Sequence, residues 1–187
     1  MSALEDLQLF RATLEPFCRD RALECRVLLA EPAAAMLGAA ALPTLFLAQC
    51  RDQLVWGRLV EAEQGGKFFI HVRTPFAIAE SLKFFRLRSY ALILAAPRPL
   101  GRVGAERALE NPPSTPDLWL WLEEATAVLL AASPPGASFV QFEGIEPMGP
   151  PSPRFHALRA VLAVGQLVGT VGTGGVKGDE GVALYVL

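Results

Sequence analysis

The sequence predicts an α+β protein in which a mixed, mostly antiparallel sheet packs against three to four helices. Two observations support this class. Residues 53–96 show the pattern of two strands, a helix and a further strand, and residues 117–187 show a second helix followed by strand patterns. The resulting order of elements fits either a ferredoxin-like sheet or a small split barrel.

The central unit begins with a hairpin. Residues 53–62 and 67–72 are two apolar runs that flank Gly65-Gly66. Glycine pairs between such runs form tight turns that need positive φ angles. A hairpin is therefore expected over residues 53–72.

A helix and a strand follow this hairpin. Thr74 suits the N-cap of a helix, and Pro75 suits the first helical position, where its missing N–H costs nothing. Residues 89–96 are too short for a long helix and too apolar for a loop, which predicts a buried strand. The helix that begins at Thr74-Pro75 is expected to bury one face, which contains Ile78, Leu82 and Phe85 at helical spacing.

The N-terminal residues predict a capped helix. Ser2 and Glu5 form a capping box, in which each side chain satisfies a backbone N–H of the other residue. The apolar periodicity continues to about Leu23. Pro16 removes a hydrogen bond inside this stretch, so we expect the helix to kink or restart there.

Two strands and a short connection are predicted between this helix and the hairpin. The strands are expected over residues 25–30 and 44–49, which are short apolar runs. The alanine-rich residues 32–42 suit a short buried helix or a tightly packed loop. Arg51 and Asp52 are expected to turn the chain into the hairpin.

A second well-defined helix begins after residue 114. Thr115-Pro116 repeats the helix-start chemistry of Thr74-Pro75, and Pro134-Pro135 ends the periodic pattern. The expected buried stripe consists of Leu118, Trp121, Leu122, Ala125 and Leu129.

The remaining residues predict a strand, a loop, a helix and a closing hairpin. The strand is expected over residues 137–142, the proline-rich loop over 147–153 and the helix over 154–164. Residues 166–171 and 181–187 are expected to pair as a hairpin around a glycine-rich loop.

Three segments describe the expected domain organisation. Residues 1–96 hold the first helix and the central unit, and residues 97–116 form a connector rich in proline and glycine. Residues 117–187 hold the second helix and the C-terminal hairpin. We expect the two outer segments to pack together as one compact domain.

The composition favours a protein that contacts another macromolecule. Apolar residues make up 52% of the 187 residues and charged residues only 19%, whereas typical domains carry about 25% charged residues. Extended apolar patches on soluble proteins usually mark interaction sites. Trp119 points away from the expected buried stripe of its helix. We therefore expect a non-enzymatic interaction or regulatory subunit that docks an apolar surface, including Trp119, on itself or on a partner protein.

Charge and cysteine content exclude several other classes. The net charge of −2 gives no overall attraction to nucleic acid or anionic lipid, so neither is an expected partner. Prolines and glycines interrupt the longest uncharged runs, which argues against a membrane span. An odd number of cysteines, three, and an acidic N-terminus without a leader pattern favour reduced thiols and a cytoplasmic location.

Basic residues supply an alternative function, the binding of an anion or a nucleotide. Lys177 lies in the glycine-rich tail, where backbone N–H groups could approach a phosphate, although the spacing matches no dinucleotide or P-loop motif. Basic and aromatic residues also mix in residues 73–90, as they do in proteins that bind single-stranded nucleic acid. Arg98 and Arg102 are the remaining candidates for anion binding.

The spacing of Arg98 and Arg102 is similar to the Arg-x-x-x-Arg of the linker that opens PilZ domains. The preceding helix and strands resemble the N-terminal half of flagellar-brake proteins. This resemblance implies binding of a cyclic dinucleotide through the two arginines. The second motif of the family, Asp-x-Ser-x-x-Gly, is absent, and residues 143–149 occupy a comparable place without the serine.

Catalytic residues are not evident in the sequence. A general base needs an orienting partner and a nucleophile within reach, and neither His71 nor His156 belongs to a recognisable motif of this kind. Two histidines leave little material for a metal site. The sequence therefore favours a protein without catalytic residues, metal or cofactor.

Overall fold

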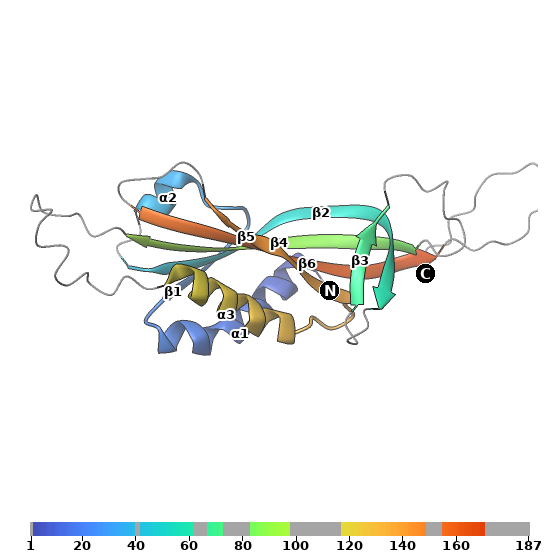
Figure 1. Cartoon of the computed structure of the whole chain (residues 1–187), viewed down its shortest axis with the longest axis horizontal. Coiled ribbons are helices and arrows are strands. Elements are labelled where there is room, and N and C mark those ends of the chain that lie inside the picture. The colour runs from blue at the N-terminus through green and yellow to red at the C-terminus, as the bar shows by residue number, and fades with distance from the viewer. Residues whose placement is uncertain are drawn as a thin grey trace, which may run out of the picture.

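A computed structural model describes residues 2–39, 42–61, 67–72, 83–97, 117–148 and 155–170 (Figure 1). These residues form three helices and six strands. In chain order the elements are α1 (Ala3–Asp20), β1 (Glu24–Leu28), α2 (Ala34–Gly38), β2 (Thr44–Glu61), β3 (Lys67–His71), β4 (Lys83–Pro97), α3 (Leu118–Ala131), β5 (Phe139–Pro147) and β6 (Phe155–Thr170).

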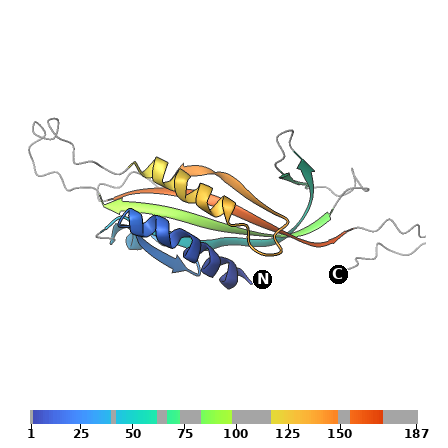
Figure 2. The same ribbon diagram turned by 90° about the horizontal axis from the view of Figure 1, so that it is seen from below.

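The strands form one mixed sheet with the order β1-β2-β4-β6-β5, and β3 pairs with the second half of β2. The pairing of β1 with β2 is parallel, and the other pairings are antiparallel. Figures 1 and 2 show α1 and α3 side by side on one face of the sheet, and Figure 1 shows α2 on the other. The predicted α+β class with a mostly antiparallel sheet is confirmed, while the ferredoxin-like and split-barrel topologies stay predictions.

α1 begins as the capping box predicts. The Ser2 hydroxyl accepts the Glu5 N–H at 3.3 Å, and the Glu5 carboxylate accepts the Ser2 N–H. The helix includes Pro16 and runs to Asp20, so of the two expectations at Pro16 the restart is wrong and the kink stays a prediction; the helix also ends before Leu23, where the second piece was expected to end. Large side chains on both sides of the proline hold the helix on the sheet and compensate for the lost hydrogen bond; they are Phe10, Leu14 and Phe17.

β2 is one long strand where two strands and a turn were predicted. The expected turn at Arg51 and Asp52 is wrong, because both residues continue the pairing with β4. Between Gln49 and Arg51 the register shifts, so a β-bulge absorbs the polar stretch. Asp52 then forms an ion pair with Arg86 of β4 at 2.8 Å.

The predicted hairpin partners are confirmed as β2 and β3, which pair from Gly57 with His71 to Glu61 with Lys67. The Gly65-Gly66 turn lies outside the described residues. β3 also approaches β5, because the Phe69 N–H donates to the side-chain oxygen of Gln141 at 3.2 Å.

β4 contains the predicted strand at residues 89–96, but it begins earlier, at Lys83. Phe85 is therefore a fully buried strand residue, and its assignment to a helix face is wrong. The rest of that predicted helix, at residues 74–82, lies outside the described residues. β4 is central in the sheet, which explains why most of its side chains are buried on both faces.

The C-terminal half confirms α3, and the strand predicted at 137–142 overlaps β5, which begins at Phe139. The helix predicted for residues 154–164 is wrong, since these residues belong to β6. Both faces of β6 are buried, and a continuous apolar run of this kind has no clear period of two. The predicted strand at 166–171 forms the end of β6, and the expected partner at 181–187 lies outside the described residues.

Three apolar clusters form the core. The largest lies between the sheet and the two helices α1 and α3, and a second lies beneath α2. The third, an aromatic cluster, fills the far half of the sheet where β3 approaches β5. The expected connector at 97–116 stays a prediction, because Pro97 ends β4 and residues 98–116 lie outside the described residues.

Candidate functional site

α3 is an almost uncharged helix that packs on the sheet beside α1. Its N-cap is Asp117, whose carboxylate accepts the Leu120 N–H at 3.1 Å, so Thr115 is not the cap that the sequence predicts. The Thr126 hydroxyl donates to the Leu122 carbonyl at 2.7 Å and thus satisfies a buried polar group. The fully buried apolar side chains of the inner face are Leu122, Ala125 and Leu129.

The opposite face of α3 exposes large apolar side chains. Trp119 is 46% exposed, Leu120 is 48% exposed and Leu130 is 38% exposed. We call this surface the α3 outer face; its exposed side chains are Trp119, Leu120, Glu123, Ala127, Leu130 and Ala131.

Charge is nearly absent from the α3 outer face. The helix has two charged residues, Glu123 and Glu124. Glu124 forms an ion pair with Arg21, whose guanidinium also lies over the Phe17 ring at 4.0 Å from its centroid. Glu124 is thus used to join α3 to the end of α1, and Glu123 is the single charge on the α3 outer face.

The neighbouring helix α1 differs from α3, although both helices lie on the same face of the sheet (Figure 2). α1 buries a similar apolar stripe, but its outward side chains are mainly polar. An ordinary surface helix has a charged outer face of this kind. The exposed charged residues of α1 are Glu5, Arg11, Glu15, Arg19 and Asp20.

The structure describes one of the four candidate site residues from the sequence. Trp119 lies exposed on α3. Arg98, Arg102 and Lys177 lie outside the described residues, so the anion-binding alternative stays a prediction. Two of the arginines in the basic and aromatic stretch are engaged in ion pairs, Arg86 with Asp52 and Arg88 with Asp6.

The two histidines lie at opposite ends of the sheet. His71 is aligned with Gly57 in the far half of β2, whereas His156 is aligned with Ala96 near the end of β4. They therefore do not share a site. Among the residues that the structure describes, no group of three or more His, Cys, Asp or Glu side chains could hold a metal ion.

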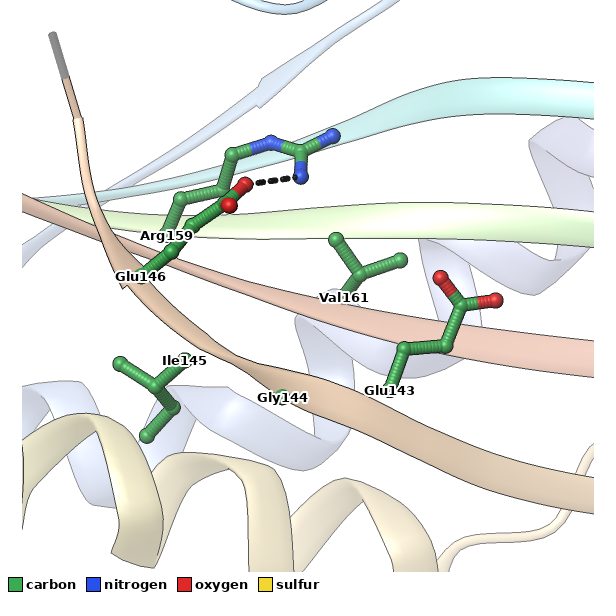
Figure 3. Close-up of a pocket in the computed structure, with 6 residues that line it drawn as sticks. All are labelled: Glu143, Gly144, Ile145, Glu146, Arg159 and Val161. Atoms are coloured by element: carbon green, nitrogen blue, oxygen red, sulfur yellow. Dashed lines mark hydrogen bonds and ion pairs between the residues drawn. The ribbon is translucent and has the colours of Figure 1, made fainter.

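A small pocket lies along the outer strand β5 (Figure 3). Its volume is about 270 Å³, and a β-bulge after Phe142 shapes it. Arg159 lines the pocket beside Glu146 and donates hydrogen bonds to Glu146 at 2.8 Å and to both carboxylate oxygens of Glu31 at 2.6 and 2.9 Å. The lining residues are Glu143, Gly144, Ile145, Glu146, Arg159 and Val161.

The charged side chains at this pocket form an ion cluster. The hydrogen bonds that Arg159 donates to the Glu31 carboxylate raise the pKa of Arg159, so the guanidinium stays charged and engaged. Burial, together with the charge of Glu31, raises the pKa of the nearby Cys50 thiol. A thiol with a raised pKa is a poor nucleophile at neutral pH. Sequence reasoning missed it because Arg159 was placed on a helix.

A buried polar cluster joins α1 to the sheet. Asp6 is fully buried, and its carboxylate accepts the Tyr90 hydroxyl and lies 2.9 Å from the Arg88 guanidinium. Arg88 is 3% exposed, and the Tyr90 ring packs edge-on against Phe10 at 5.3 Å. Burial and then the hydrogen bond to Asp6 raise the pKa of Tyr90 well above its usual range.

The raised pKa of Tyr90 predicts a loss of stability at alkaline pH. The unfolded chain releases the phenol proton above about pH 10, while the folded protein retains it, so stability falls as pH rises through that range. We expect the free energy of unfolding of the native protein, measured against Tyr90→Phe, to fall by about 1.4 kcal/mol per pH unit above pH 10. Urea unfolding of both proteins between pH 8 and 11 measures this. A constant difference across that range would contradict it.

Comparison with known proteins does not assign this chain to a family. No protein-family model matches the chain, and no curated protein is similar to it at a significant level. No helix in the described ranges is both long and apolar enough to cross a membrane. The described residues thus define an α+β protein whose helical layer has one apolar and nearly uncharged outer face.

Proposed function

We propose that this chain is a non-enzymatic interaction subunit that binds another protein through the α3 outer face. The observation that carries the proposal is the contrast between two helices on one face of the sheet. α1 turns charged side chains outward, while α3 turns Trp119, Leu120 and Leu130 outward. The packing of the described residues buries the inner face of α3 and leaves Trp119, Leu120 and Leu130 exposed, so this packing does not explain the apolar character of the α3 outer face.

The composition of the α3 outer face suits a binding surface. Tryptophan is enriched among the residues that dominate binding energy, and charged residues are depleted in the buried centre of interfaces. Trp119 and Leu120 lie together at the start of the helix, and the ion pair between Arg21 and Glu124 provides a polar group nearby. An apolar centre beside polar groups is the usual anatomy of a protein interface.

The first test is photo-crosslinking from defined positions in the cells that make the protein. A benzophenone amino acid replaces Leu120 or Leu130, and the control replaces Ala12, which is exposed on α1. We expect discrete protein adducts from the two α3 positions and none from residue 12. Trp119→Asp should abolish these adducts and weaken binding of the identified partner by about 30-fold or more, because loss of a central tryptophan typically costs about 2 kcal/mol.

The adduct also identifies the partner. Its mass separates a second copy of this chain from a different protein. Equal adducts from residue 12 and from the α3 positions, or adducts that persist in Trp119→Asp, would contradict the proposal. Thermal unfolding of Trp119→Asp provides the control for folding, since an exposed side chain should change stability by no more than about 0.5 kcal/mol.

A further inference from the structure

β5 and β1, the strands at the two ends of the sheet order, differ in how well they are protected. β5 has a bulge between Phe142 and Gly144, with Gly144 at φ +142°, and it ends at Pro147. Its exposed Glu143 and Glu146 add charge. Bulges, charges and proline are the devices by which proteins prevent an edge strand from pairing with another chain.

β1, the strand at the other end of the sheet order, has neither a bulge nor a proline, and its exposed charges are of opposite sign. It is a regular strand of five residues, Glu24–Leu28, without proline or glycine. Among the described strands it pairs with β2 alone. One side of β1 is therefore an open edge as far as the described part of the chain shows.

The backbone register shows which groups of β1 point outward. The Glu24 N–H donates to the Pro43 carbonyl at 3.1 Å, and Glu24 is aligned with Thr44 in the parallel pairing. Bonding alternates along a strand, so the N–H and C=O groups of Glu24, Arg26 and Leu28 point toward β2. The N–H and C=O groups of Cys25 and Val27 consequently point away from the sheet.

The side chains of β1 are complementary to themselves in one antiparallel register. Glu24 and Arg26 project on the same face, where they form an ion pair with each other at 2.8 Å while their side chains stay 47% and 44% exposed. If two copies pair antiparallel with Cys25 opposite Cys25, then Glu24 of each copy lies opposite Arg26 of the other. The same register makes Cys25 a hydrogen-bonded pair, which uses the outward N–H and C=O groups.

Neighbouring registers lack this complementarity. A shift that centres the pairing on Arg26 places two arginines opposite each other, and like charges in that position are destabilising. Centring on Val27 places Arg26 opposite Leu28 and leaves both charges without a cross-strand partner. Opposite charges across antiparallel strands stabilise the pairing, so charge selects the register centred on Cys25.

We propose that two copies of this chain associate through their β1 edges, antiparallel and centred on Cys25, to form one continuous sheet. The partner is a second copy because the charges of β1 complement themselves under twofold symmetry, which is the symmetry of an isologous dimer. This surface is separate from the α3 outer face, so the inference does not rest on the proposed function.

A charge-exchange series tests the proposal by sedimentation velocity and light scattering of the full chain. Arg26→Glu and Glu24→Arg each turn two attractive cross-strand pairs into two repulsive ones, and each should weaken the dimer by about tenfold. The double variant Glu24→Arg/Arg26→Glu restores both attractions, and its dissociation constant should return to within about twofold of the native value.

Arg86→Glu provides the matched control for Arg26→Glu, because both variants change the net charge equally and Arg86 also belongs to an exposed ion pair, on β4. It should leave the dimer unchanged. Circular dichroism and thermal unfolding confirm the fold of each variant, and the exposure of Glu24 and Arg26 makes these substitutions tolerable.

Val27→Pro tests whether the dimer depends on the outward backbone N–H groups of β1. The Val27 N–H points away from β2, so Val27→Pro retains the bonds between β1 and β2 and removes a donor from the dimer edge. We expect a folded monomer. A native protein that is monomeric at 100 μM would overturn the proposal, as would a dimer insensitive to the single charge reversals or one that the double variant fails to restore. A dimer that only Trp119→Asp disrupts would assign self-association to α3 instead.

Discussion

Arg88→Met is expected to lower the free energy of unfolding by about 3–5 kcal/mol at pH 7. Arg88 and Asp6 form an ion pair in which the two side chains are 3% and 0% exposed. Removal of the arginine leaves a buried carboxylate whose solvation by water is blocked, and that desolvation is the physical cause of the loss. Urea or thermal unfolding of the native protein and the variant measures the effect.

Arg86→Met provides a matched control two residues away on the same strand. Arg86 also makes two hydrogen bonds with an aspartate, Asp52, at 2.8 and 3.0 Å. Its side chain is 50% exposed, and exposed pairs of this kind contribute about 0–1 kcal/mol. Similar losses for Arg86→Met and Arg88→Met would show that burial does not determine the energy of the Asp6 pair.

Removal of both charges should cost less than removal of one. In Asp6→Leu/Arg88→Met no charge remains in the cluster, and a buried ion pair can often be replaced by apolar residues without net loss. Tyr90 would still lose the acceptor of its hydroxyl, at a cost of about 1–3 kcal/mol. We therefore expect the double variant to be more stable than Arg88→Met but less stable than the native protein.

Gly165→Ala is expected to lower the free energy of unfolding by about 3 kcal/mol, at the upper end of the range for overpacked cores. A β-carbon at this position would lie 1.9 Å from a ring carbon of Phe139. That ring cannot withdraw easily, because it stacks on Phe69 at 4.7 Å and packs edge-on against Phe85 at 5.8 Å. The clash therefore displaces the whole aromatic cluster of the far half of the sheet.

A double variant distinguishes the steric clash with Phe139 from the effect that replacing glycine has on the flexibility of the backbone. Phe139→Leu alone should destabilise the protein by loss of packing, and in Phe139→Leu/Gly165→Ala the smaller side chain makes room for the new methyl group. The double variant should then be more stable than the sum of the two single effects predicts, by about 1 kcal/mol or more. Strict additivity would indicate that the ring is not the obstacle.

Local patterns in the sequence were sufficient to predict the helices α1 and α3. The capping box at Ser2 and the apolar stripe that includes Leu122 and Leu129 each depend on residues within a few positions, so α1 and α3 were predictable. The hairpin of β2 and β3 was predictable for the same reason.

Strands buried on both faces were predicted less well. Leu158 and Leu162 of β6 fit a helical spacing, but Ala157, Val161 and Ala163 are buried on the other face of the same strand. The apolar run therefore contains no period that separates strand from helix. Only the pairing with β4 and β5, which is nonlocal, determines the conformation of β6.

The candidate surface was only partly predictable. Exposure of Trp119 followed from its position outside the apolar stripe of its own helix. The contrast with α1 and the open edge of β1 depend on the order of strands in the sheet, which the sequence does not reveal. Cys25 and Val27 carry no local sign that their backbone groups point outward.

The bulge of β5 has a consequence for the size of any assembly made through β1. In a pair of chains joined at that edge, the two ends of the combined sheet are both β5 strands, and each carries the irregular backbone around Gly144. An irregular, charged edge of this kind disfavours pairing with a further strand, so the two β5 ends oppose growth of the sheet into a fibre.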